Sequence, residues 1–295
     1  MALRDREPVE GKDKPFVHVS GEAITTPAGL SQKYLFIPSQ VREVYLVYLL
    51  MHLVTVTGHP ALERSQQKPA TNQTDGRKQN NNNSRKRKRA NDDDKESKET
   101  AVRLPQTILF VPHCRTAALF TALLNQLPTP IPCTALHSHL SQAERLASLQ
   151  TFRRQAVPLL IATDVGSRGL DIPDVSVVVN WQVPRLAEDY IHRVGRTARM
   201  GRSGTSITIV TENDVELLQA LETRIGTQLE EIELNEEEVL QMMSGVSMAK
   251  RVASIELHKD GYGQREEVRK QKVQAAAGRN KKKKKGSNMT GSAIL

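Results

Sequence analysis

The sequence predicts an α/β fold built on a doubly wound parallel sheet. Short apolar segments rich in Val, Ile and Leu alternate along the chain with amphipathic segments whose apolar residues recur every three or four positions. This alternation is typical of parallel strands joined by right-handed helical crossovers. Aromatic residues make up only 4% of the 295 residues and polar tracts are long, so we expect one core of ordinary domain size.

The expected strands and helices follow one another through the chain. Strands are predicted over residues 34–38, 106–111, 131–137, 158–163, 175–180 and 205–210. A helix is predicted over 42–53, and a second helix carries Leu119, Leu123 and Leu127, spaced four residues apart.

Two capping boxes predict where further helices begin. Ser141 and Glu144 form a Ser-x-x-Glu box. The helix behind it is expected to bury Leu146, Leu149 and Phe152. Thr211 and Asp214 look like a second box. The helix after it carries Val215, Leu218, Leu221 and Ile225.

Composition separates a folded domain from polar segments. The domain is predicted to span 30–226, with a low-complexity insertion at 61–104 that cannot bury enough apolar surface to order itself. Residues 1–29 form a polar connection, 227–257 are expected to add a helical extension, and 258–295 are expected to be a basic disordered tail.

The net charge of +9 lies in the polar segments. The insertion holds 12 Lys/Arg against 7 Asp/Glu, and residues 257–295 hold 11 against 3, which leaves −4 for the rest of the chain. Arginines in the folded body are therefore a local feature. The runs 85–89 and 281–285 fit nuclear import signals or phosphate-binding tails, and plain solvated charge is the alternative.

Membrane and disulfide signatures are weak. The longest apolar run, 44–56, contains His52 and is too short to span a bilayer, so we expect a buried helix and no membrane partner. The charged N-terminus lacks the apolar region of a signal peptide. Two cysteines, Cys114 and Cys133, suit a reducing compartment rather than a disulfide framework.

A first polar motif follows the predicted strand 158–163. Thr163 and Asp164 stand at its carboxyl end, where open α/β sheets place their ligands. An Asx turn alone explains such a Thr-Asp pair, but it does not explain the residues that follow. These are Gly166 and Gly169, which allow close backbone approach to a ligand, Arg168, which can hold an anion or Asp171, and Asp171, which suits a ribose hydroxyl.

The second motif spans residues 190–202 and holds four arginines and one histidine. Arg196 and Arg199 are three apart, so they are predicted to share one face of a helix. Two guanidiniums side by side repel each other unless they share an anion, and a triphosphate fits because guanidinium forks match phosphate oxygens. The alternative is a solvated basic helix that pairs with nearby acids.

These motifs carry a resemblance to a known family. Residues 162–173 resemble motif V of the DEAD-box RNA helicases, and 192–199 resemble their motif VI. Residues 136–145 and 108–111 are similar to the family's segments between motifs IV and V and to its motif IV strand. The likeness runs from about residue 16 to 241 and covers only the second RecA-like domain, so residues 1–29 are interpreted as a remnant of the interdomain linker.

The resemblance implies ATP with Mg²⁺, bound between two domains. The ATP-binding residues would be Gly169, Asp171, Arg196 and Arg199. Arg196 and Arg199 would act as arginine fingers on the γ-phosphate. His192, as a further catalytic residue, and Arg193 would couple to the acidic motif of the other domain.

The resemblance also implies RNA held by its sugar-phosphate backbone, with little sequence preference. The residues expected on the RNA path are Thr163, Asp164, Gly166, Arg168, Gln142, Arg145 and His137. For His137 a packed loop histidine is the alternative. The chain departs from motif IV at Pro112, which has no backbone donor, and whether Arg115 takes over that RNA contact stays open.

Neither a Gly-x-x-x-x-Gly-Lys-Ser/Thr loop nor an Asp-Glu-Ala-Asp run occurs in the 295 residues. In the family both belong to the N-terminal RecA-like domain, which holds the metal. We therefore expect this chain to need that domain as a partner, with a protein cofactor as a further candidate, and to be inactive on ATP alone. The 229–257 extension resembles fungal members in ribosomal-RNA maturation, which implies pre-ribosomal RNA and a nuclear, nucleolar location.

Two sharper interpretations remain open. A zinc site is one; its ligands would come from His113, Cys114, Cys133, His137 and His139, although their spacing matches no common zinc pattern. Base stacking on Trp181 is the other, although a lone tryptophan at the end of a strand is more often core.

Two functions from different classes follow. One is the C-terminal half of an ATP-dependent RNA helicase, and the other is a non-catalytic RNA-binding or regulatory RecA-like module. The intact set of Asp171, Arg196 and Arg199 favours the helicase, because a pure binding module has no need of a nucleotide wall.

Overall fold

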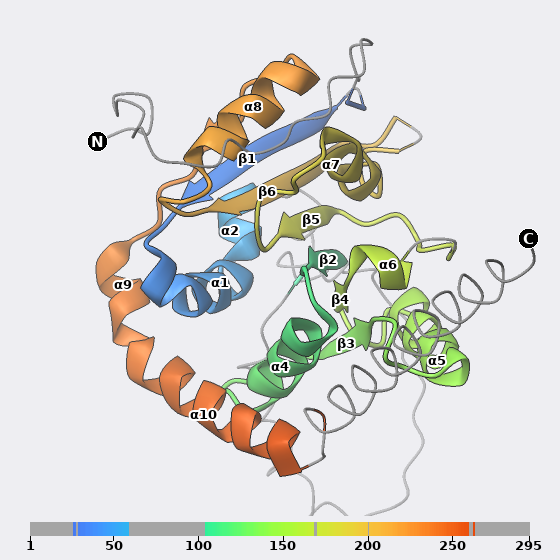
Figure 1. Cartoon of the computed structure of the whole chain (residues 1–295), viewed down its shortest axis with the longest axis vertical. Coiled ribbons are helices and arrows are strands. Elements are labelled where there is room, and N and C mark those ends of the chain that lie inside the picture. The colour runs from blue at the N-terminus through green and yellow to red at the C-terminus, as the bar shows by residue number, and fades with distance from the viewer. Residues whose placement is uncertain are drawn as a thin grey trace, which may run out of the picture.

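A seven-stranded, fully parallel sheet organises the molecule (Figure 1). The computed structural model describes residues 26–27, 29–58, 104–167, 170–199, 201–259 and 262. The strands are β1 (Leu30–Phe36), β2 (Thr107–Phe110), β3 (Cys133–Leu136), β4 (Leu159–Ala162), β5 (Val177–Asn180), β6 (Gly204–Val210) and β7 (Glu230–Glu231). Their order in the sheet is β3-β4-β2-β5-β6-β1-β7.

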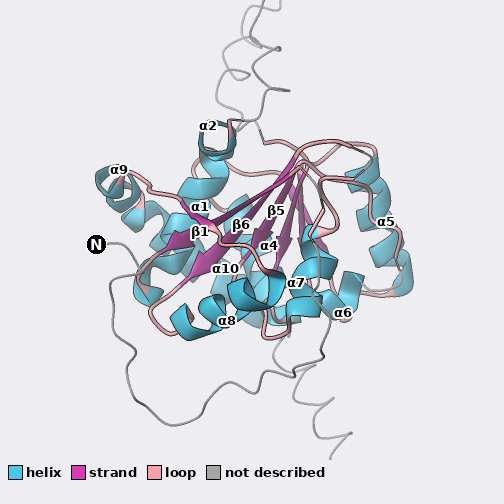
Figure 2. Cartoon of the chain, turned by 90° about the horizontal axis from the view of Figure 1, so that it is seen from above, coloured by secondary structure: helices cyan, strands magenta, loops and turns pink. Residues whose placement is uncertain are grey.

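Helices cover both faces of this sheet, which confirms the doubly wound α/β prediction (Figures 1 and 2). After a short 3-10 turn, η2 (Ser39–Val41), the helices are α1 (Arg42–Met51), α2 (Leu53–Thr57), α4 (Cys114–Asn125), α5 (Gln142–Arg153), α6 (Asp164–Ser167), α7 (Ala187–Val194), α8 (Val215–Ile225), α9 (Glu236–Gln241) and α10 (Met243–Lys259). Helices α1, α2, α4, α9 and α10 pack on one face, and α5, α7 and α8 pack on the other.

The alternation of strand side chains produces the two cores. In β2, Ile108 and Phe110 pack with α5, whereas Leu109 points to the opposite core with α4. Both faces are apolar because both are covered, as parallel sheets require.

The C-terminal helices belong to the main core. Val239 of α9 and Val246, Ala249 and Ala253 of α10 are buried in the cluster that α1 and α4 form. Polar contacts add to this packing: Tyr48 Oη donates to Glu238 Oε2 at 2.6 Å, and Lys250 Nζ lies 2.5 Å from Glu43 Oε1. Helix α10 continues to Lys259.

One predicted capping box is confirmed, while two helix boundaries and the burial of Leu146 differ from prediction. The Ser141 capping box is confirmed, because Glu144 N–H donates to Ser141 Oγ and Ser141 N–H donates to Glu144 Oε2. The Thr211 box is wrong: the carboxylate of Asp214, the N-cap of α8, accepts from the N–H and hydroxyl of Thr211, so that hydroxyl is a donor rather than a cap.

The remaining differences concern the predicted helix 42–53 and Leu146. The first helix breaks at His52 into α1 and α2, ahead of a segment rich in β-branched residues. Leu146 is 47% exposed, because only the second half of α5 is buried where it packs beside β3, the edge strand.

The other predicted segments fall mainly outside the part of the chain that the structure describes. Of the predicted connection 1–29, the described residues are 26, 27 and 29, and of the insertion 61–104 only Leu104 is described. Of the predicted tail 258–295, the described residues are 258, 259 and 262.

Candidate nucleotide and RNA site

The first motif forms a helical turn at the carboxyl end of β4. Thr163 is 3% exposed, and its Oγ1 accepts a hydrogen bond from the backbone N–H of Gly166 at 3.2 Å. A Cβ on Gly166 would lie 2.6 Å from the carbonyl oxygen of Leu136 and 2.7 Å from Cα of His137, so a larger residue does not fit. The close backbone approach expected of Gly166 is therefore to the protein's own chain.

Helix α5 supports this turn from the side. Arg145 Nη2 donates to the carbonyl oxygen of Gly166 at 2.9 Å, and Nη1 donates to Gln142 Oε1 at 3.2 Å. The structure thus brings Gln142, Arg145, Thr163 and Gly166 together at one edge of the sheet. Their contacts with RNA stay predictions.

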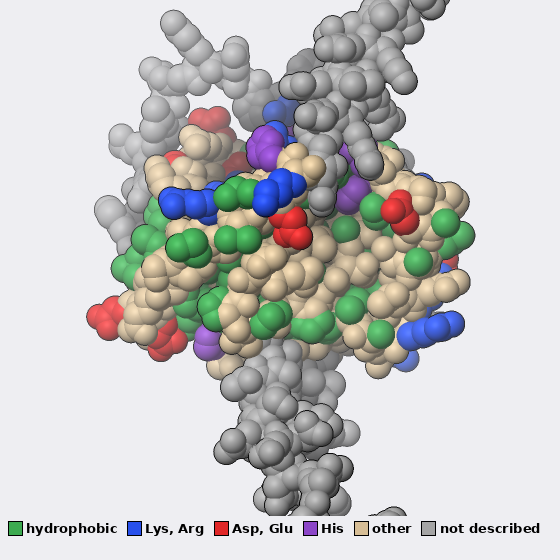
Figure 3. All heavy atoms as spheres, turned by 90° about the horizontal axis from the view of Figure 1, so that it is seen from below, with side chains coloured by type: hydrophobic (Ala, Val, Ile, Leu, Met, Phe, Trp, Pro, Cys, Tyr) green, Lys and Arg blue, Asp and Glu red, His purple; other side chains and the backbone are tan. Residues whose placement is uncertain are grey.

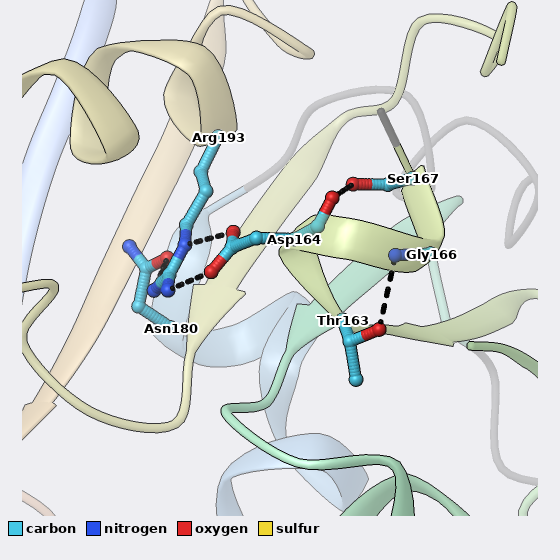
Figure 4. Close-up of polar contacts among 6 residues, drawn as sticks. All are labelled: Thr163, Asp164, Gly166, Ser167, Asn180 and Arg193. Atoms are coloured by element: carbon cyan, nitrogen blue, oxygen red, sulfur yellow. Dashed lines mark hydrogen bonds and ion pairs between the residues drawn. The ribbon is translucent and has the colours of Figure 1, made fainter. Parts of the chain in front are cut away.

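Asp164 forms an ion pair inside the domain (Figure 4). Arg193 of α7 donates from Nε to Oδ1 and from Nη2 to Oδ2 of Asp164, each at 2.8 Å. Its Nη1 donates to Asn180 Oδ1 at 3.3 Å, and Asn180 Nδ2 donates to Thr208 Oγ1 at 3.1 Å. The Arg193 side chain is 6% exposed, so it joins the ends of β4 and β5 to α7 rather than facing another domain.

His137 lies beside the same turn and is 3% exposed, with no hydrogen-bond partner for its Nδ1 among the described residues. Burial, and to a smaller extent His139, lowers the pKa of His137 from 6.5 to about 4, while Glu144 acts in the opposite sense. The imidazole is therefore neutral at physiological pH. The packed-loop alternative describes its position, and its contact with RNA stays a prediction.

The pKa of His137 makes the stability of the fold sensitive to acid. The unfolded chain binds a proton at this site near pH 6.5 and the folded chain only near pH 4, so stability is full above pH 6.5 and falls as the pH drops toward 4, by up to about 3 kcal/mol. Urea unfolding at pH 7.5, 6 and 5 measures this loss. His137→Gln should flatten the decline, and an unchanged slope would contradict the assignment.

The second motif leaves the helix before its finger arginines. Helix α7 ends at Val194, so the prediction that Arg196 and Arg199 share a helical face is wrong. Thr197 redirects the chain: its Oγ1 donates to the carbonyl oxygens of Val175 at 2.6 Å and Ser176 at 3.1 Å, at the amino end of β5.

The turn that follows α7 is not helical, and close packing holds it in place. Ala198 adopts a left-handed backbone with φ of 56°. A Cβ on Gly204 would lie 2.1 Å from Thr197 Oγ1 and 2.6 Å from the backbone nitrogen of Ala198, so only glycine allows the turn to pack on β6. Thr197 and Gly204 therefore position the turn that carries Arg196 and Arg199, a role that the sequence motifs did not predict.

Arg196 and Arg199 nevertheless lie close enough to repel each other. Burial, and then the charge of Arg199, lowers the pKa of Arg196 below its ordinary value, whereas Asp171 and Asp174 raise it. Arg199 Nη1 lies 3.3 Å from Asp174 Oδ1, and Nε donates to the carbonyl oxygen of Gly195. Two adjacent guanidiniums, one partly desolvated, form a setting that a phosphate would stabilise.

The remaining nucleotide residues are less constrained. Asp171 pairs with Arg153 at 2.7 Å through Oδ2, but its side chain is 92% exposed, so the carboxylate is accessible for a ribose hydroxyl. His192 is exposed on the last turn of α7. Arg168 and Gly169 lie outside the described residues. Asp174, three residues before β5, carries no motif signal in the sequence.

The two sets of candidates lie at opposite ends of the strands. Thr163 and Asp164 follow the carboxyl end of β4, whereas the backbone N–H of Val175, just before β5, donates to the carbonyl oxygen of Arg196 at 3.0 Å. The last turn of α7 connects the two sets, because the side chain of Arg193 reaches Asp164 and the finger turn follows directly after Val194.

The zinc and base-stacking interpretations are not supported. Among the described residues, which include all five proposed ligands, no group of three or more His, Cys, Asp or Glu side chains could hold a metal ion. Trp181 is 8% exposed, packs edge-to-face on Phe120 at 4.8 Å and lies 4.4 Å from the guanidinium carbon of Arg42. Within the described part of the chain, no helix is long and apolar enough to cross a membrane.

Comparison with known proteins agrees with this geometry. Residues 98–201 match the helicase conserved C-terminal domain. The chain is 44% identical over 290 residues to the ATP-dependent RNA helicase DBP8 of Mycosarcoma maydis, covering 96% of this chain and 54% of that protein. It is 34% identical to the probable ATP-dependent RNA helicase DDX49 of Homo sapiens, covering 88% of this chain and 44% of that protein.

A solved structure shows the same fold. S. cerevisiae Dbp5 bound to RNA and ADP BeF3 superposes with a TM-score of 0.50 at 23% identity, over 77% of this chain and 46% of that one. The fold, the two motifs and the sequence relatives define a helicase C-terminal domain. This domain is the helicase C-terminal domain of a DEAD-box RNA helicase, and the chain spans about half the length of the curated relatives it matches.

Proposed function

We propose that this chain is the C-terminal half of an ATP-dependent RNA helicase, which binds the RNA backbone and supplies arginine fingers to ATP. The observation that carries the proposal is the turn at 195–199, which Thr197 and Gly204 hold in place and in which Arg196 lies near enough to Arg199 for that charge to lower its pKa. Two guanidiniums that repel each other suit a phosphate whose charge develops during phosphoryl transfer.

The described residues provide one wall of such a site. Arg196 and Arg199 would face the γ-phosphate and Asp171 the ribose, while the P-loop and the Mg²⁺ ligands would come from a separate N-terminal RecA-like domain. None of the described residues forms a metal-binding group, so no metal step is assigned to them. We propose that the 295 residues do not hydrolyse ATP on their own.

Helix α7 offers a physical link between RNA and ATP. A strand of RNA that contacts the turn at Thr163 and Asp164 would press on the Asp164–Arg193 pair, and Arg193 stands at the end of α7, three residues before Arg196. Binding at one end would thereby bias the position of the fingers at the other. This is a two-site coupling of the kind that linked binding requires.

An RNA-binding comparison tests the RNA part of the proposal. Single-stranded RNAs of unrelated sequence should bind the chain with affinities within about threefold of one another, and DNA should bind more weakly, because recognition uses phosphates and 2′-hydroxyls. Fluorescence anisotropy at fixed salt measures both. A strong preference for one sequence, or equal binding of RNA and DNA, would contradict it.

One observation favours a second candidate, a non-catalytic RNA-binding module. Arg199 is paired with Asp174, and Asp171 is paired with Arg153, so two of the nucleotide candidates already have partners within the chain. Both pairs are partly or largely exposed, however, and exposed pairs are weak enough for a nucleotide to displace them.

We further propose pre-ribosomal RNA as the substrate and the nucleolus as the location. The support is the resemblance of the 229–257 extension to fungal members of this kind, together with the basic runs at 85–89 and 281–285. Fluorescence microscopy of the tagged protein tests this location, and a uniformly cytoplasmic signal would count against it.

A further inference from the structure

A groove between the first turns of α4 and the end of α10 has no role in the site described so far. It is lined by Arg115, Leu119, Ser254, Leu257, His258 and Tyr262. One wall therefore comes from the RecA-like core and the other from the C-terminal extension. We propose that this groove is an RNA subsite, which extends the candidate RNA site at the carboxyl end of β4 onto α10. The inference rests on the RNA-binding function proposed above.

The groove is continuous with the predicted RNA edge. The ring of Tyr262 lies 5.8 Å from that of His139 and 6.4 Å from that of His137. Cys114 Sγ, in the first turn of α4, lies 3.3 Å from Ser138 Oγ in the loop after β3. Because Cα of His137 abuts Gly166, the turn after β4, the loop after β3 and the groove are direct neighbours.

The lining suits a nucleotide of a single strand. Arg115 and His258 are both exposed, and within the described residues neither is paired with an acidic side chain, so both are available to phosphate oxygens. Leu119 and Leu257 provide an apolar floor for a ribose or base. None of these groups reads a base edge, so the subsite would not depend on sequence.

Charge in the sequence beyond α10 points the same way. Figure 3 shows, on the molecule seen from below, Lys/Arg, Asp/Glu and histidine side chains mostly around the margins and a middle that is mostly uncharged. From α10 onward the sequence becomes strongly basic, with 11 Lys/Arg against 3 Asp/Glu in residues 257–295. An RNA strand is the partner whose charge complements both the groove and the sequence that follows it.

The groove also gives Arg115 a role where the sequence departs from motif IV. Pro112 removes a backbone donor after β2, and the exposed guanidinium of Arg115 stands three residues later, facing α10. Arg115 would then meet RNA together with His258 of the extension rather than within the core alone.

Salt-dependent RNA binding by the full chain tests the subsite. For a 15-nucleotide RNA, Arg115→Ala and His258→Ala should each weaken binding by about threefold to tenfold at low salt, and Arg115→Ala should lower the slope of log affinity against log salt by about 0.7. Arg115→Lys should keep the slope, because lysine still neutralises one phosphate. A 6-nucleotide RNA can bind at the β4 turn without entering the groove, so the groove variants should weaken its binding less.

Arg154→Ala is the matched control, because Arg154 is an exposed arginine at the end of α5, away from the groove. It should leave the 15-nucleotide affinity unchanged. If wild-type chain binds RNA but the groove variants match it in affinity and slope, the subsite is overturned while the proposed function stands. If wild-type chain binds neither RNA, the proposed function itself fails, and the subsite with it.

Discussion

Arg193→Met is expected to lower the free energy of unfolding by about 3 kcal/mol, because it leaves the carboxylate of Asp164 partly buried without its cation. The lost contacts are two hydrogen bonds of 2.8 Å to Asp164 and one to Asn180. The guanidinium also lies 5.5 Å from the ring centroid of Phe110, so methionine keeps the packing volume but loses a cation–π contact. Urea denaturation of wild type and variant measures the difference.

Arg153→Met provides the control for this prediction. It makes the same chemical change in a pair of similar length, 2.7 Å to Asp171, but the two side chains are 47% and 92% exposed. Exposed pairs contribute at most about 1 kcal/mol, so this variant should be nearly as stable as wild type. Equal losses in the two variants would show that burial of the Asp164–Arg193 pair does not matter.

The second large effect is on rate. In a protein that joins this chain to a P-loop-bearing DEAD-box N-terminal domain, Arg199→Ala and Arg196→Ala should each reduce RNA-stimulated ATP turnover by about 10³–10⁵-fold. The physical reason is that each removes a fixed positive charge from the place where negative charge develops on the γ-phosphate. Lysine at either position should rescue little, because it lacks the planar fork of arginine.

Arg202→Ala is the matched control for the finger variants. Arg202 belongs to the same motif and is exposed, but it lies beyond the turn that Thr197 fixes, and its backbone N–H donates to the carbonyl oxygen of Arg199. Its turnover should remain within a few-fold of wild type, and RNA affinity should be unchanged in all three variants. A loss confined to RNA affinity would assign the arginines to RNA instead of ATP.

Much of the fold was predictable because the spacing of apolar residues along the sequence agrees with the burial of these residues in the structure. Strand β4 is apolar throughout and β5 is apolar up to Asn180, every residue of both strands is buried, and the Ser141 box marks the start of α5 without ambiguity. The two-residue β7 was not predicted, because its Glu-Glu sequence carries no apolar signal. It pairs with β1 at Lys33 and Tyr34, a tertiary contact that local sequence does not show.

The contacts among the candidate site residues could not be predicted from the sequence. Arg193 and Asp164 are 29 positions apart, and their pairing depends on α7 crossing the end of β4. The motif at 190–202 reads as helix throughout, yet the bonds from Thr197 to the carbonyl oxygens before β5 end it early. Such hydrogen bonds to a distant strand are decided by tertiary packing, which overrides local helix propensity.

RNA-stimulated ATP hydrolysis, measured for this chain alone, for a P-loop-bearing DEAD-box N-terminal domain alone and for the two joined in one protein, tests the central claim most directly. The account predicts turnover only in the joined protein and its loss in Arg199→Ala. Turnover by the chain alone, or a joined enzyme that is indifferent to Arg199→Ala, would contradict the claim that this chain supplies one wall of a two-domain ATP site.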